Sequence, residues 1–119
     1  HIQYILTDVL GMSFSSREDV VNEKVNVLKI FPKDKNSAIE LLEPTSQDSV
    51  IQKYLNKNGP GIHHIALTVD SINEAILYLK FNNISLVYNT PQSGSDNKLI
   101  TFIHPKSTPG LLIELCQRT

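Results

Sequence analysis

A pattern repeated at a spacing of 74 residues constrains this 119-residue chain more than any single motif does. Ile39-Glu40-Leu41 recurs as Ile113-Glu114-Leu115, and the Ile-x-Tyr pattern of residues 2–4 recurs at residues 76–78. An internal repeat of this length indicates two similar modules that pack together in one domain. The repeat also gives Glu40 and Glu114 equivalent positions in the two modules.

The second half of the chain predicts a complete module. Residues 62–69 are rich in β-branched and aliphatic side chains and predict a strand. Ser71 and Glu74 form a capping box, after which apolar residues recur at helical spacing. Three further strands are predicted at residues 85–88, 99–104 and 111–116. The predicted order is therefore one strand, one helix and three strands.

The first half predicts only part of such a module. Residues 2–10 predict the end of a helix that Gly11 stops, and two strands are predicted at residues 25–31 and 38–42. Asp48 is predicted to cap a short helix that connects the two modules.

The repeat also predicts what the first module lacks. A shift of 74 residues places the counterpart of His64 before residue 1. We therefore expect the first strand of module one, and the residue opposite His64, to be missing from this chain. The predicted organisation is a single α+β domain of residues 1–119, with module one at 1–44, a connector at 45–60 and module two at 61–119.

The composition argues against several classes of protein. With 40% hydrophobic and 19% charged residues, the chain is typical of a folded globular domain and not of a disordered one. A net charge of −1 gives no electrostatic reason to expect binding to nucleic acid or to an anionic membrane. No apolar run approaches the roughly 20 residues of a membrane-spanning helix. The single cysteine, Cys116, excludes a disulfide within the chain.

Strand alternation predicts which face each side chain of module two occupies. In the first strand we expect His63 on the face that the helix covers, together with Ile65, Leu67 and Val69. His64 then lies on the opposite face. In the last strand Glu114 also lies away from the helix, so His64 and Glu114 are expected on the same side of the sheet.

His64, Glu40 and Glu114 are the candidate metal ligands. An acid flanked by apolar residues in a strand is costly to bury unless it is paired, protonated or bound to a metal. A single His on a strand is more commonly a hydrogen-bonded structural residue, and a strand Glu can simply face water, as we prefer for Glu43. The repeat nevertheless relates the three candidates. Imidazole and carboxylate form a ligand set for a divalent ion such as Co²⁺, Zn²⁺, Mn²⁺ or Ni²⁺.

Several segments resemble the methylmalonyl-CoA epimerase family, a branch of the vicinal oxygen chelate superfamily that includes glyoxalase I. The matching segments include Ile39 to Pro44, Asn58 to Ala66 with its Gly61-Ile62-His63-His64 motif, and His104-Pro105-Lys106-Ser107. The resemblance implies two paired βαβββ modules, as in the glyoxalase-like fold, around a divalent metal for which Co²⁺ is favoured. It places His64, Glu114 and Glu40 at ligand positions.

Two features of the family pattern are absent. The remaining family ligand, a His on the first strand, would fall where the repeat predicts the missing strand. Some relatives carry a catalytic Glu in the second strand, and here the nearest positions hold Asn26 and Val27.

The function that the resemblance implies is the interconversion of (2R)- and (2S)-methylmalonyl-CoA. The reaction is a metal-assisted proton abstraction alpha to the thioester, with Glu114 as the candidate general base. The resemblance also implies an acyl-CoA substrate, a homodimer, and a location in the bacterial cytoplasm or the mitochondrial matrix.

Two alternative functions remain open. A metal-dependent glyoxalase-type isomerase is the enzymatic alternative, because the same site supports it. A metal-free small-molecule binding protein of the bleomycin-resistance type is the non-enzymatic alternative, and the retention of His64, Glu40 and Glu114 argues against it.

Overall fold

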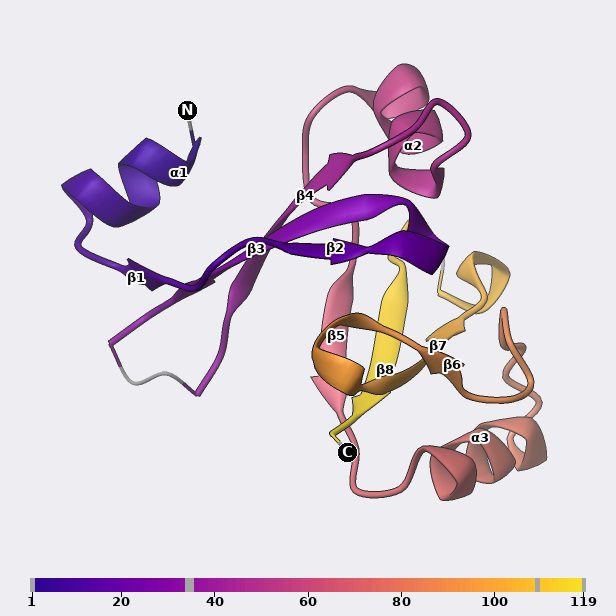
Figure 1. The fold of residues 1–119 in the computed structure, drawn as a ribbon. Helices are drawn as coiled ribbons and strands as arrows, with labels where there is room; N and C mark the ends of the chain where they lie inside the picture. The colour runs from indigo at the N-terminus through magenta and orange to yellow at the C-terminus, as the bar shows by residue number, and fades with distance from the viewer. Residues whose placement is uncertain (1, 34–35, 109, 119) are drawn as a thin grey trace. The chain divides into compact units, whose positions relative to one another are not determined.

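The computed structural model describes residues 2–33, 36–108 and 110–118, and the chain divides into two compact units, residues 1–60 and 61–119 (Figure 1). Each unit contains one four-stranded sheet together with helices, which confirms the predicted α+β class. No helix among the described residues is long and apolar enough to cross a membrane.

The first unit begins with a short helix that changes geometry along its length. α1 (Ile2–Tyr4) continues as a π-helix (Ile5–Val9), in which the Thr7 hydroxyl donates to the Gln3 carbonyl at 2.8 Å. Gly11 follows with a φ of +76°, a left-handed conformation that glycine adopts without steric cost. Its N–H donates to the Thr7 carbonyl at 3.0 Å. The predicted helix and its glycine stop are both confirmed.

The sheet of the first unit is organised around β3 (Val25–Phe31), which matches the predicted strand. β4 (Ile39–Pro44) pairs antiparallel with one edge of β3 and runs two residues beyond the predicted end at Leu42. Two short strands, β1 (Ser13–Phe14) and β2 (Glu18–Val20), pair antiparallel with the other edge of β3. A 3₁₀ turn (Val21–Glu23) connects β2 to β3. Segments of two or three residues carry no measurable periodicity, so the sequence did not predict β1 or β2.

The core of the first unit involves the sheet and α2 (Val50–Asn58). One buried cluster consists of Val20, Val25 and Val27, against which Leu42 and Ile51 pack. Leu28 and Ile30 of β3 are also buried.

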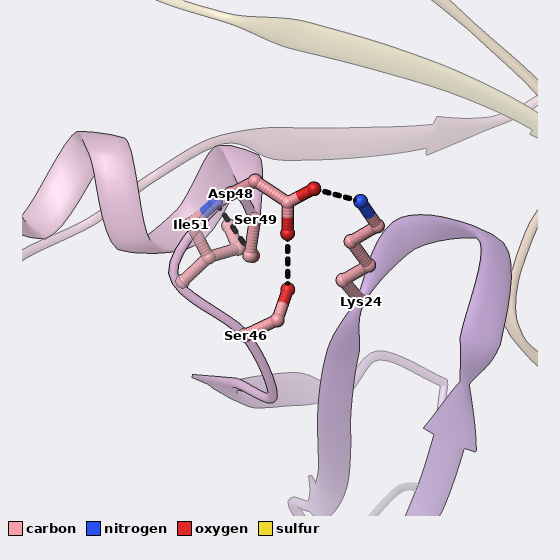
Figure 2. Close-up of polar contacts among 5 residues, drawn as sticks. All are labelled: Lys24, Ser46, Asp48, Ser49 and Ile51. Atoms are coloured by element: carbon pink, nitrogen blue, oxygen red, sulfur yellow. Dashed lines mark hydrogen bonds and ion pairs between the residues drawn. The ribbon is translucent and has the colours of Figure 1, made fainter.

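The N-terminal cap of α2 differs from the prediction. The Ser49 hydroxyl accepts a hydrogen bond from the Ile51 N–H at 3.1 Å, so Ser49 is the cap and not Asp48 (Figure 2). The Asp48 carboxylate instead accepts hydrogen bonds from the Lys24 ammonium and from the Ser46 hydroxyl, the latter at 2.6 Å. An ammonium group is a stronger partner for a carboxylate than a backbone N–H.

The second unit has the strand order β5-β8-β7-β6 (Figure 1). β5 and β8 are parallel, whereas the β8–β7 and β7–β6 pairs are antiparallel. α3 follows β5, and the Ser71 hydroxyl accepts from the Glu74 N–H at 3.2 Å, as the capping box predicts. The elements are β5 (Ile65–Thr68), α3 (Ile72–Phe81), β6 (Gln92–Ser93), a 3₁₀ turn (Ser95–Asn97), β7 (Leu99–Ile103), a second 3₁₀ turn (Pro105–Ser107) and β8 (Ile113–Gln117).

The strand predicted at residues 85–88 forms only a single bridge, between Leu86 and Ile103. Its backbone still bonds to the β7 segment, because the Val87 N–H donates to the Phe102 carbonyl at 2.8 Å. Regular pairing resumes at β6, after Pro91, which has no N–H to donate to a ladder.

The core of the second unit lies under α3. Ile72 and Ile76 of the helix pack with Leu86 and Ile103, and Val69, Leu79, Ile84, Leu99 and Ile113 lie against this cluster. The prediction that Ile65 and Leu67 also lie under the helix is wrong, since they are 47% and 50% exposed. β5 is an edge strand, and α3 contacts β7 and β8.

Candidate active site

His64 and Glu114 lie together on one face of the second unit's sheet. Glu114 of β8 is in register with Ala66 of β5, and His64 comes two residues before Ala66. His64 Nε2 lies 3.3 Å from Glu114 Oε1, and the two side chains are only 12% and 14% exposed. This pairing agrees with the face that alternation predicts, while the roles of both residues as metal ligands stay predictions.

Two aromatic rings that the sequence analysis did not single out extend this face. Phe102 of β7 is in register with Glu114, and its ring centroid lies 5.8 Å from that of His64 at an interplanar angle of 85°. The ring of Tyr88 lies 6.4 Å from that of Phe102. Alternation along residues 99–104 would have placed Phe102 beside Glu114 once the β7–β8 register was known.

His63 contacts His64 and does not follow the predicted orientation. The two Nδ1 atoms are 2.9 Å apart, and the rings meet edge to face with centroids 5.1 Å apart. Burial lowers the pKa of His63, the neighbouring His64 lowers it further, and Glu114 opposes the shift. The predicted separation onto opposite faces is wrong because β5 begins only at Ile65, so alternation does not extend back to His63.

Glu40 belongs to the first unit and has a cationic neighbour. It is in register with Lys29 across the β3–β4 pair, and Lys29 Nζ lies 3.8 Å from Glu40 Oε2. The side chains of Lys29 and Glu40 are 12% and 25% exposed. An ion pair is one of the conditions under which a strand carboxylate can be buried, so Lys29 explains how this sheet accommodates Glu40.

Neither residue near the expected catalytic Glu position can act as a base. Val27 is 4% exposed and belongs to the apolar core of the first unit. The Asn26 amide donates to Asp19 Oδ1 at 2.8 Å and accepts from Arg17 Nη1 at 3.1 Å. An amide has no proton-accepting role at ordinary pH, so Asn26 serves a polar network on the sheet.

The donor set of the second unit fits a divalent metal in part. Ligand atoms that each lie about 2.0–2.2 Å from one ion can be about 3 Å apart, as the imidazole and carboxylate of His64 and Glu114 are. Among the described residues, no group of three or more His, Cys, Asp or Glu side chains is placed to hold a metal. The three-residue set with Glu40 therefore stays a prediction.

Comparison with known proteins identifies the superfamily. Residues 2–102 match the model of the Glyoxalase/Bleomycin resistance protein/Dioxygenase superfamily. The mitochondrial methylmalonyl-CoA epimerase of Dictyostelium discoideum is 42% identical over 101 residues, which are 80% of this chain and 61% of that protein. The chain thus spans less than two thirds of that relative.

Solved structures of two bacterial epimerases resemble this chain along nearly its whole length. The methylmalonyl-CoA epimerase of Mycobacterium tuberculosis is 33% identical with a TM-score of 0.91, and the similarity covers 99% of this chain and 77% of the other. A Streptomyces coelicolor methylmalonyl-CoA epimerase variant in complex with 2-nitronate-propionyl-CoA is 31% identical, with a TM-score of 0.87 and coverage of 99% and 83%. The chain therefore belongs to the glyoxalase, bleomycin-resistance and dioxygenase superfamily, and within it to the methylmalonyl-CoA epimerase family.

Proposed function

We propose that this protein interconverts (2R)- and (2S)-methylmalonyl-CoA by removing and returning the proton at the carbon alpha to the thioester. The observation that carries the proposal is the pairing of His64 and Glu114 on one sheet face, in a chain of the epimerase family. The acyl-CoA analogue bound by the Streptomyces coelicolor relative supports an acyl-CoA substrate. We also propose a homodimer, which light scattering would test.

A divalent metal is part of this proposal, because enzymes of the superfamily typically use one. His64, Glu114 and Glu40 are the residues that we propose to hold it. When bound, such an ion supplies Lewis acidity toward the substrate oxygens. Co²⁺ is the ion we favour, with Zn²⁺, Mn²⁺ and Ni²⁺ as alternatives.

The chain's own residues supply the proton chemistry and the surroundings of the site. The Glu114 carboxylate is the proposed base, and its low exposure removes water that would otherwise solvate and weaken it. In the metal-free protein, a hydrogen bond from His64 Nε2 would hold this carboxylate in one orientation. The rings of Phe102 and Tyr88 add apolar surface on the same side of the sheet.

A solvent-exchange assay tests the proposed function. The protein is loaded with each candidate metal in turn and incubated with (2R)-methylmalonyl-CoA in D₂O, and deuterium at the alpha carbon is followed by mass spectrometry. We expect exchange together with formation of the (2S) form. Turnover of a glutathione hemithioacetal in place of methylmalonyl-CoA would favour the glyoxalase-type isomerase. Ligand binding without turnover of either substrate would favour the binding protein.

A further inference from the structure

Asn58 and Gly59 form the only Asn-Gly sequence in the chain, and they stand where α2 ends. An asparagine followed by glycine loses its side-chain amide readily, because glycine has no Cβ to hinder attack by its own backbone nitrogen. The Asn58 side chain is exposed. The space beside Gly59 is open, since no atom outside residues 58–60 would lie within 4 Å of a Cβ there. Nothing around this pair therefore shields it sterically.

The loss of the amide is a reaction between the Asn58 side chain and the Gly59 backbone. The Gly59 nitrogen gives up its proton and attacks the side-chain carbonyl carbon of Asn58, and the side-chain nitrogen leaves as ammonia. Water then opens the resulting cyclic imide at one of its two carbonyl carbons. The product is aspartate or isoaspartate, and in isoaspartate the main chain is one carbon longer. The reaction consumes one water and releases one ammonia, with no oxidation or reduction.

The folded chain engages both reacting groups in hydrogen bonds. The Gly59 N–H donates to the Leu55 carbonyl at 2.8 Å, as the cap of α2. The Asn58 side-chain amide donates to the Tyr54 carbonyl at 3.2 Å. A backbone N–H that is held in a helix gives up its proton slowly until the local structure opens. The last turn of α2 must therefore open before the Gly59 nitrogen can attack.

We propose that Asn58 is a deamidation site whose rate is set by the opening of the last turn of α2. The product cannot restore the original helix end. A carboxylate at position 58 has no N–H to donate to the Tyr54 carbonyl. It also places a negative charge at the C-terminal end of a helix, where the macrodipole disfavours it. The modified residue lies just before the junction of the two compact units, which divide after Pro60.

Peptide mapping by mass spectrometry tests the site. The full chain is incubated in mildly alkaline H₂¹⁸O, once folded and once in guanidinium chloride, so that each new carboxylate carries the heavy oxygen. We expect Asn58 to convert in both samples. A turn that is open about a tenth of the time makes the folded chain react about tenfold more slowly. Asn56 is the internal control, since it is exposed on the same helix but precedes Lys57, and it should keep its amide.

Two variants at the exposed Lys57 test the role of the last turn. Lys57→Gly and Lys57→Ala both remove the same cation, but glycine is the poorer helix former. In the folded state Asn58 should therefore convert about fivefold faster in Lys57→Gly than in Lys57→Ala. In guanidinium chloride the two variants should react at the same rate, because neither has a helix to open.

Contrary results would overturn separate parts of the proposal. Retention of the Asn58 amide in guanidinium chloride would remove the site itself. Equal rates in the folded and denatured parent would show that the last turn does not control the reaction, and so would equal rates in the two folded variants. If Lys57→Gly does not fold, the ratio of the two rates in the parent decides the question.

Discussion

Nε2 of His64 lies 3.3 Å from Oε1 of Glu114, in side chains that are 12% and 14% exposed. The parallel pairing of β5 with β8 produces this contact, because Glu114 is in register with the residue two positions after His64. A largely buried carboxylate beside an imidazole is an arrangement found at metal and acid–base sites. Four predictions follow from this pair and from the ion pairs of the first unit.

Glu114→Gln should lower epimerisation about 100–10,000-fold, the usual contribution of a general base. The fold should persist, because Gln is nearly isosteric and keeps an acceptor oxygen for His64. Proton exchange at the alpha carbon measures the loss, and circular dichroism checks the fold. Glu43→Gln is the matched control, since Glu43 is an exposed strand residue of β4. Near-parental turnover by Glu114→Gln would remove Glu114 from the mechanism.

His64→Ala should abolish divalent metal binding, because it removes the only ring nitrogen that lies beside Glu114 among the described contacts. Elemental analysis after loading and dialysis measures the metal bound per chain. His104→Ala should retain the parental content, since His104 is exposed in a turn. Equal metal content in His64→Ala and the parent would place the metal elsewhere.

Lys29→Met should lower the free energy of unfolding and tighten metal binding at the same time. Glu40 would lose its ion pair with a cation 3.8 Å away, a loss of roughly 1 kcal/mol. The same cation repels a divalent ion at Glu40, so its removal favours the metal. Urea denaturation and Zn²⁺ titration measure the two effects.

Lys24→Met provides the control for Lys29→Met. Lys24 is also paired with a carboxylate, that of Asp48, but both of these side chains are exposed, at 44% and 65%. We expect only a small loss of stability, because exposed ion pairs contribute little, and no change in metal affinity. Weaker metal binding by Lys29→Met would contradict competition between Lys29 and the ion for Glu40.

Asp48 should make the stability of the first unit depend on pH in the acid range. Hydrogen bonds from Lys24 and then from Ser46 lower its pKa from 3.8 to about 2 (Figure 2). Because the pKa is depressed in the folded state, the stabilisation is present above pH 3.8 and is lost as pH falls through about 2.

Carbon NMR of the Asp48 carboxyl measures this titration. The midpoint should lie near 2 in the parent and rise toward 3.8 in Lys24→Met, since Lys24 is the largest cause of the shift. The difference in stability between the parent and Asp48→Asn should disappear over the same pH range. A midpoint that does not respond to Lys24→Met would show that this ion pair does not form in solution.

Much of the fold follows from local sequence. The glycine at position 11, the capping box of Ser71 and the apolar run of β3 act within a few residues of themselves, and all three behave as predicted. Short-range stereochemistry determined these features.

Contacts between segments that lie far apart in the sequence determined the features that the sequence did not predict. Ser49 and not Asp48 caps α2 because Lys24, far away in the sequence, attracts the Asp48 carboxylate. Ile65 and Leu67 are exposed because β5 is an edge strand, which no periodicity in β5 itself can reveal.

The same distinction applies to the candidate site. The sequence alone identified His64, Glu114 and Glu40 as residue types suited to a metal. Only the tertiary structure placed His63 Nδ1 against His64 and Lys29 beside Glu40. A side chain's chemistry is set by its residue type, whereas its hydrogen-bond and ion-pair partners depend on strand register and on where each strand begins.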